Sequence, residues 1–167
     1  MKKYFSIAIA SLLMAASMFL SSCGDDDDFI PDDNQEQVMM EWTEPFHAKN
    51  SSIEEVKAFM ASSMKSYRLV AETSTAENTQ LSYSTSNPNV GVLYSFSKVT
   101  GQLYSVIDTE LTANSSMIFN FLRDHYDVVS SNNTSLQYCF ATPDKSMVIT
   151  TVKVADNYFN INYTFVY

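Results

Sequence analysis

The sequence contains few of the residues that mark the most recognisable enzyme sites. Its 167 residues include only three glycines, two cysteines and two histidines. Beyond Gly24 there are Gly91 and Gly101, and neither lies in a G-x-x-x-x-G-K-S/T or G-x-G-x-x-G loop that would cradle a phosphate. His47 and His125 form no H-x-x-x-H or H-E-x-x-H motif. The sequence therefore predicts no nucleotide-binding loop and no metal site.

Basic residues are also scarce. Lys and Arg number 10 against 19 Asp and Glu, which gives a formal net charge of −9. Nucleic-acid binding depends on clustered Lys and Arg that displace counterions from phosphates, so we expect no nucleic-acid partner. The acidic excess is local, because residues 24–44 hold nine acidic and no basic residues, whereas residues 45–167 hold ten acidic and eight basic. The charge of the later residues alone therefore identifies no partner.

The sequence pattern offers no activated nucleophile. Cys139 is the only cysteine besides Cys23, and it falls in the middle of an expected strand, where we predict a small packed residue. No G-x-S-x-G motif gives a serine the context of a hydrolase. His125 lies on the apolar stripe of an expected helix, so we predict a partly buried residue at the helix end.

The carboxylates have structural explanations. Glu54 and Glu55 fit a helix N-terminus, and Asp108 and Glu110 fit an exposed strand end. No pair of carboxylates can be selected for glycoside cleavage. We therefore expect a protein that is not an enzyme and that uses no cofactor.

The N-terminus has the order of an export signal. Met1-Lys2-Lys3 is positively charged, residues 4–20 are mostly apolar, and Leu20-Ser21-Ser22-Cys23 follows. The last four residues resemble the lipobox of bacterial lipoproteins. The resemblance implies that residues 1–22 are a signal peptide and that Cys23 carries the lipid that anchors the protein to a membrane. The alternative is an uncleaved transmembrane helix with an incidental cysteine.

An acidic run follows the lipobox. Asp25, Asp26, Asp27 and Asp28 come directly after Gly24, and this run resembles the surface-export signal of Bacteroidota-type lipoproteins. The resemblance implies an outer-membrane protein that faces the cell exterior. The alternative is a solvated spacer. Residues 23–40 hold little that could be buried, so we expect an acidic tether.

The rest of the chain, 41–167, is expected to form a single α+β domain in which the order of elements repeats. Ser52 and Glu55 fit a capping box at the start of a first helix. Periodicity and turn residues then predict strands at 67–73, 80–86, 91–98 and 102–111. A second helix is expected after Asn114, followed by strands at 126–130, 135–141, 146–154 and 157–167. The sequence thus predicts two helix-plus-four-strand repeats, at about 51–112 and 114–167.

The repeat also shows in the sequence itself. An offset of 55 residues aligns 81–112 with 136–167 without a gap and brings together like residues, among them Leu81 with Leu136 and Tyr83 with Tyr138. This alignment supports a duplicated unit.

Alternation assigns the two faces of the predicted sheet. In the last strand Phe159, Ile161, Tyr163, Phe165 and Tyr167 share one face, and Asn160, Asn162 and Thr164 share the other. This pattern predicts an antiparallel sheet with helices packed on one apolar face and solvent on the other. The element order resembles the tandem architecture of β-lactamase-inhibitor-protein-like domains, which implies one long curved sheet. A two-sheet sandwich is the alternative.

The polar sheet face is the candidate binding face. It carries small hydroxyls and amides that could hydrogen-bond a glycan or a protein loop, namely Ser84, Ser95, Ser105, Asn160 and Asn162. Most tyrosines fall on the apolar face, and Trp42 is expected to close the core edge, with ligand stacking as its alternative. We expect a non-catalytic binding module for an extracellular glycan or protein. The alternatives are a periplasm-facing structural or assembly subunit of an envelope complex and, by fold analogy only, a protein inhibitor.

Overall fold

The computed structural model describes residues 41–167. The predicted signal peptide (1–22), the tether (23–40), the lipidation site Cys23 and the acidic run Asp25–Asp28 lie outside the described residues. In the described part of the chain, neither helix is both long enough and apolar enough to cross a membrane.

The first helix forms where the capping box predicts it. Helix α1 spans Ile53–Ser63, the backbone N–H of Glu55 donates to Ser52 Oγ, and the Glu55 carboxylate accepts from the Ser52 N–H at 2.8 Å. These two bonds satisfy backbone donors that have no partner within the helix. Val56 and Met60 point from α1 into the core. The second helix, α2 (Ser115–His125), follows a short 3-10 turn, η2 (Thr112–Asn114).

All eight predicted strands are present. They are β1 (Arg68–Ser74), β2 (Asn78–Ser84), β3 (Gly91–Ser97), β4 (Leu103–Leu111), β5 (Asp127–Asn132), β6 (Gln137–Ala141), β7 (Met147–Ala155) and β8 (Tyr158–Phe165). The turn residues Asn87-Pro88-Asn89 separate β2 from β3. Gly101, with φ of 70°, lies in the turn before β4, where a left-handed backbone favours glycine.

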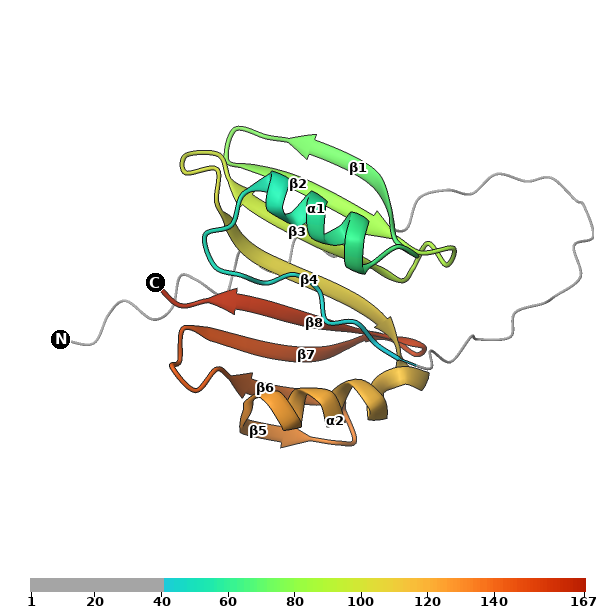
Figure 1. Ribbon diagram of the computed structural model, residues 1–167. Helices are drawn as coiled ribbons and strands as arrows, with labels where there is room; N and C mark the ends of the chain where they lie inside the picture. Colours follow the sequence, from blue (N-terminus) through green and yellow to red (C-terminus); the bar gives the residue numbers. More distant parts are fainter. Residues whose placement is uncertain (1–40) are drawn as a thin grey trace, which may run out of the picture. The chain divides into compact units, whose positions relative to one another are not determined.

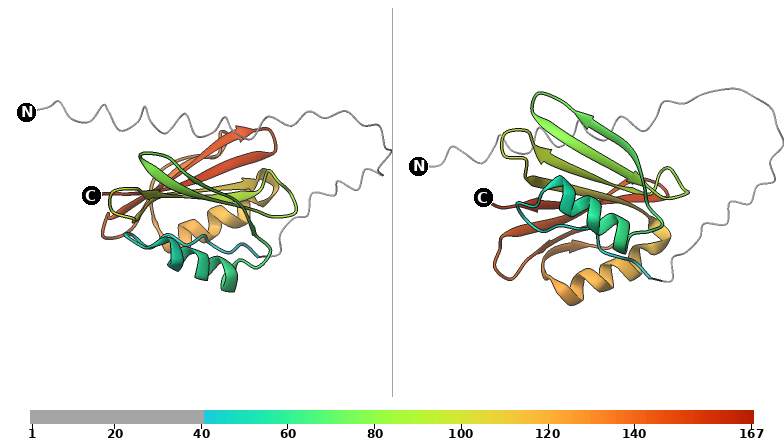
Figure 2. Two further views of the ribbon diagram at one scale, coloured as in Figure 1. Left: turned by 90° about the horizontal axis from the view of Figure 1, so that it is seen from above. Right: turned by 45° about the horizontal axis from the view of Figure 1, so that its top comes forward.

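The strands form one antiparallel sheet in the order β1-β2-β3-β4-β8-β7-β6-β5 (Figure 1). The strands of each half, β1–β4 and β5–β8, are connected by hairpins, and the two halves meet at the central β4–β8 pair. The fold is therefore α+β, as predicted, and the alternative of a two-sheet sandwich is wrong. Both helices cover the same face of the twisted sheet (Figure 2).

Residues 41–50, which we call the N-terminal strap, cross that covered face between the two helices (Figures 1 and 2). The ring of Phe46 packs against Phe59 of α1, and the ring of Trp42 meets Phe121 of α2 edge-on. The strap thus fills the space above the central strands that neither helix reaches.

The core lies between the sheet and this helix-and-strap layer. Alternate residues of the six inner strands are buried there, including Leu81, Tyr94, Phe140 and Ile161. Tyr167 departs from the prediction that it shares this face. It lies beyond the end of β8 and is exposed, with the Lys49 ammonium 4.3 Å from its ring centre. The sheet has ended there, so alternation no longer determines where the side chain points.

The two edge strands are exposed along their whole length. Every residue of β1 and of β5 is solvent-exposed, and each strand pairs on one side only. Each also carries a register shift, at Val70 in β1 and at Val129 in β5. The two edge strands are therefore the least shielded strands of the sheet.

Candidate functional site

The predicted binding face is the uncovered side of the sheet, and the structure gathers part of the predicted set there. Ser95 of β3 lies directly opposite Ser105 of β4. Asn160 and Asn162 lie on the adjacent strand β8, opposite Thr109 and Ile107. These four predicted residues therefore share the centre of one sheet face.

Ser84 is further from this centre. It lies at the end of β2, opposite Gly91, in a cross-strand row that continues through Thr109 to Asn160. At about 4.8 Å per strand, three strand spacings separate Ser84 from Asn160 by roughly 14 Å. The predicted set is thus a spread surface and not a single convergent site.

The predicted binding face is also less exposed to solvent than expected. Ser95 and Asn162 are buried, and the apolar Leu93 and Ile107 lie opposite each other between the polar residues. Small side chains flanked by larger neighbours in the middle of a wide sheet are shielded even where no helix covers them. The alternation correctly assigned the face but could not give the exposure.

Some polar groups on this face already have partners within the protein. The Thr109 hydroxyl donates to Asn160 Oδ1 at 3.0 Å, and the Asn162 amide donates to the Thr150 carbonyl at 3.3 Å. A hollow of about 290 Å³ lies elsewhere, beside α1, and is lined by Lys57, Met60, Ala61, Lys65, Tyr67 and Tyr83. Ligand binding in a deep cleft therefore finds no support on the predicted face.

Cys139 and His125, the other residues considered for chemistry, have packing contacts in the structure. Cys139 is half-buried in β6, opposite Thr150, as predicted for a packed strand residue. His125 differs from its prediction, because it is exposed and stacks on Phe121 with ring centres 4.1 Å apart. Its position at the last residue of α2 places the ring on the outside of the helix end. Among residues 41–167, no group of three or more His, Cys, Asp or Glu is arranged to hold a metal ion.

The buried acidic pair under the strap is the main feature that sequence reasoning missed. Asp108 and Glu110 were expected at an exposed strand end, and that expectation is wrong, because both side chains are fully buried. They lie on the inward face of β4 with Val106. The available signal was their spacing from Val106, since residues two apart on a strand share a face. Because Asp and Glu are rarely buried, the two residues were predicted to be exposed despite this spacing.

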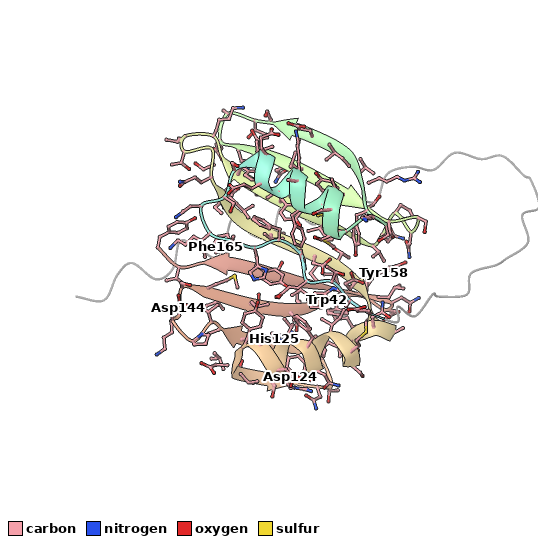
Figure 3. The ribbon with its side chains drawn as sticks, in the orientation of Figure 1. Trp42, Asp124, His125, Asp144, Tyr158 and Phe165 are labelled. Atoms are coloured by element: carbon pink, nitrogen blue, oxygen red, sulfur yellow. The ribbon has the colours of Figure 1, made fainter. Side chains whose placement is uncertain are left out.

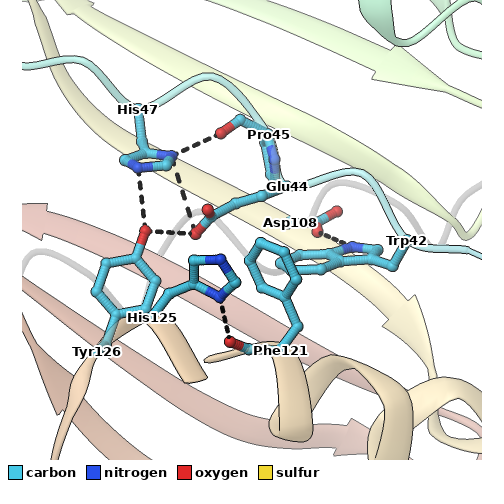
Figure 4. Close-up of polar contacts among 8 residues, drawn as sticks. All are labelled: Trp42, Glu44, Pro45, His47, Asp108, Phe121, His125 and Tyr126. Atoms are coloured by element: carbon cyan, nitrogen blue, oxygen red, sulfur yellow. Dashed lines mark hydrogen bonds and ion pairs between the residues drawn. The ribbon is translucent and has the colours of Figure 1, made fainter. Parts of the chain in front are cut away.

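Each carboxyl accepts one hydrogen bond from an aromatic donor. The indole N–H of Trp42 donates to Asp108 Oδ2 at 3.2 Å, and the Tyr67 hydroxyl donates to Glu110 Oε1 at 3.0 Å. Within the described residues, Asp108 Oδ1 has no hydrogen-bond partner, and none of the ion pairs involves either carboxyl. Trp42 is itself buried over the sheet (Figures 3 and 4), as predicted for a residue that closes the core edge.

Burial governs the protonation of this pair. It raises the pKa of Asp108 well above its ordinary value, and the nearby Glu110 raises it further. Burial also raises the pKa of Glu110 to about 7 from 4.5, although hydrogen bonds from Tyr67 and Asn114 oppose the shift. Both carboxyls are therefore protonated well below neutral pH, and Glu110 titrates around neutrality.

A second polar cluster joins the strap to the start of β5. The Tyr126 hydroxyl donates to Glu44 Oε1 at 2.7 Å and lies 3.2 Å from His47 Nε2 (Figure 4). The His47 ring stacks on Tyr163 of β8, with ring centres 5.1 Å apart. These contacts hold the strap over the centre of the sheet.

The structure thus places the predicted binding residues on an uncovered sheet face and reveals an acidic pair beneath the strap. Comparison with family models, with curated proteins and with solved structures finds no match to this chain.

Proposed function

We propose that this chain is a lipid-anchored protein of the outer membrane, displayed outward, whose folded domain binds a protein partner and catalyses no reaction. The N-terminal pattern supports the anchor through its lipobox-like Leu20-Ser21-Ser22-Cys23, and the Asp25–Asp28 run supports outward display. The observation that carries the binding role is the pair of exposed, apolar edge strands.

The edge strands offer the contacts that a protein partner uses. Leu69 and Val70 on β1, and Val128 and Val129 on β5, are 44% to 63% exposed. The outer edge of each strand also presents backbone donors and acceptors that no neighbouring strand of the described chain uses. Exposed apolar side chains beside unpaired backbone groups are typical of surfaces that bind an extended protein segment.

The β-bulges in the two edge strands indicate which kind of protein partner fits. A register shift at Val70 and another at Val129 interrupt each edge, which disfavours indiscriminate edge-to-edge pairing between copies. The apolar side chains remain exposed nonetheless. The arrangement fits a specific protein partner better than general self-association.

A glycan ligand has weaker support. Sugar binding commonly uses exposed aromatic rings beside polar groups, but Tyr83, Tyr94, Tyr138 and Tyr163 are buried in the core. On the uncovered face, which carries Ser84, Ser105 and Asn160, the Asn160 side chain already accepts a hydrogen bond from Thr109. This face remains the place to look if a glycan is the ligand.

We further propose that the domain consists of two tandem repeats, α1 with β1–β4 and α2 with β5–β8. The matching bulges at Val70 and Val129 support this, because each lies in the edge strand of its half. Equivalent pairs in the middle strands, Tyr83 with Val92 and Phe140 with Ile149, are offset by 57 residues, not by 55. The two offsets differ by two residues, and side chains alternate between faces with a period of two, so either offset matches residues on the same face of the sheet.

Site-specific photocrosslinking on intact cells tests the binding role. A photoreactive residue at Val70 or at Val129 should form a defined protein adduct. Val99 provides the matched control, because it is an exposed valine in a hairpin turn at 93% exposure and belongs to no edge strand. Absence of an adduct at both edge positions, or the same adduct at Val99, would refute the edge-strand role.

Protease treatment of intact and lysed cells tests the location. We expect external protease to remove the domain from intact cells, and we expect Asp25–Asp28 replaced by asparagine to reduce this removal while Cys23 stays lipidated. Removal only after lysis would favour the periplasm-facing subunit instead. A domain that is removed equally well without the four aspartates would show that the acidic run is only a spacer.

A further inference from the structure

Every hydrogen bond that joins the strap to the domain in the described chain involves at least one side chain. Trp42 donates to Asp108, Tyr126 donates to Glu44, and Lys49 donates to the Val166 carbonyl at 2.7 Å. In the described chain, no backbone–backbone hydrogen bond joins residues 41–50 to the sheet. The strap can therefore leave the sheet without breaking a strand ladder.

The strap covers two carboxyl groups that water does not reach. Trp42 lies over Asp108 and its indole also interacts with Glu110. Both carboxyls are fully buried, two residues apart on the same face of β4, and Asp108 Oδ1 has no hydrogen-bond partner among residues 41–167. Two negative charges in this position would repel each other and would lack a counter-ion.

No Lys or Arg of the described residues forms an ion pair with either carboxyl of the buried pair. Glu44 and His47 face it from the strap, and its other titratable neighbours are the tyrosines of the surrounding strands and loops, Tyr67, Tyr94, Tyr126 and Tyr163. On the helices, Glu54, Glu55, Arg123, Asp124 and His125 are exposed, and Lys57 pairs with Glu72. Ionisation of the pair would therefore be compensated only by hydration.

We propose that ionisation of Asp108 and Glu110 releases the strap, so that residues 41–50 dissociate as the pH rises while the eight-stranded sheet stays folded. Departure of Trp42 removes the side chain that covers Asp108 and admits water to both carboxylates. Release of the strap breaks no backbone–backbone hydrogen bond of the described chain, whereas relief of the buried charges by unfolding would break the β4–β8 ladder as well.

The raised pKa values agree with this geometry. Burial raises the pKa of Asp108 well above its usual range and that of Glu110 to about 7. Both groups are therefore neutral when the strap is bound at low pH. Hydration favours their ionised forms, so a rise in pH favours the released strap.

The test uses Trp42, the only tryptophan in the chain, as its reporter. The full-length chain in detergent is titrated from about pH 5 to about pH 9. We expect a red shift of the indole emission and a several-fold rise in acrylamide quenching, with a midpoint near that of the acidic pair and an unchanged far-UV circular dichroism spectrum. The double variant Asp108→Asn with Glu110→Gln should lose the transition.

The control variant Asp124→Asn with Glu54→Gln removes two exposed charges and should retain the wild-type transition. If the double variant fails to fold, Glu110→Gln alone should weaken the transition. Three outcomes would overturn the proposal: no change in Trp42 between the pH limits, the same transition in the double variant, or loss of the sheet signal together with the indole signal. The last outcome would mean global unfolding and not strap release.

Discussion

At the scale of single residues, Glu110 makes the stability of the domain depend on pH. Its carboxyl is fully buried on β4, and burial raises its pKa to about 7 from an ordinary value of 4.5. A folded state whose acid has a raised pKa binds more protons than the unfolded chain at intermediate pH. The stabilisation is therefore complete below about pH 4.5 and is lost as the pH rises through about 7.

We predict that the free energy of unfolding falls by up to about 3 kcal/mol between these pH values, at about 1.4 kcal/mol per pKa unit. Glu110→Gln should flatten this pH dependence, because a neutral amide does not titrate. Urea denaturation followed by circular dichroism at pH values across this range provides the measurement. An unchanged slope in the variant would mean that another group, such as Asp108 alone, causes the dependence.

At the scale of elements, α1 begins where its capping box satisfies the first backbone donors. The Ser52 hydroxyl accepts from the Glu55 N–H, and the Glu55 carboxylate accepts from the Ser52 N–H. We predict that Ser52→Ala lowers the free energy of unfolding by about 1 kcal/mol, the usual cost of losing such a cap. Ser66→Ala, at an exposed serine after the helix, is the control and should have almost no effect. Equal losses in both variants in thermal denaturation would contradict the cap's role.

The elements also show what a sequence can predict. Turn residues and alternation located all eight strands, and the capping box located α1, because these signals act over a few neighbouring residues. The exposure of β1 and β5 was not predictable in the same way. Leu69 and Val128 are apolar like the core residues of other strands, and their exposure depends on their position at the edges of the folded sheet, which local sequence does not give.

The prediction that Asp108 and Glu110 are exposed was wrong for a related reason. Alternation with Val106 gives their face, but their burial depends on Trp42, which lies 66 residues earlier in the chain. A strap without regular secondary structure carries no periodic signal. The polar face illustrates the converse, since Ser105 and Asn160 were assigned to the correct side while the burial of Ser95 and Asn162 was missed.

At the scale of the whole molecule, the β4–β8 pair joins the two halves into one sheet. Seven residue pairs connect these strands, from Ser105 with Thr164 to Leu111 with Tyr158. Their position at the centre, under the strap, gives them neighbours on both sides. The edge strands β1 and β5 have a neighbour on one side only.

We predict a gradient of amide hydrogen exchange across the sheet. The amides of β4 and β8 should exchange slowest, and those of β1 and β5 fastest, because local opening at an edge breaks fewer contacts. Mass spectrometry of peptides from the purified chain measures the order. Strong protection of β1 or β5 in the purified protein would show that these edges are already covered, for example by a second copy.

The strap also determines how the protein responds to a pulling force. In the proposed anchored state, tension between Cys23 and a partner held at β1 or β5 passes through the strap before it reaches the sheet. It acts first on the side-chain contacts of Trp42 and Glu44, one after another, and reaches the strand ladders only when residues 41–50 have come away. Ten residues can span at most roughly 35 Å when fully extended, at about 3.3–3.6 Å each. The strap would thus lengthen the connection under load and protect the sheet from mechanical rupture.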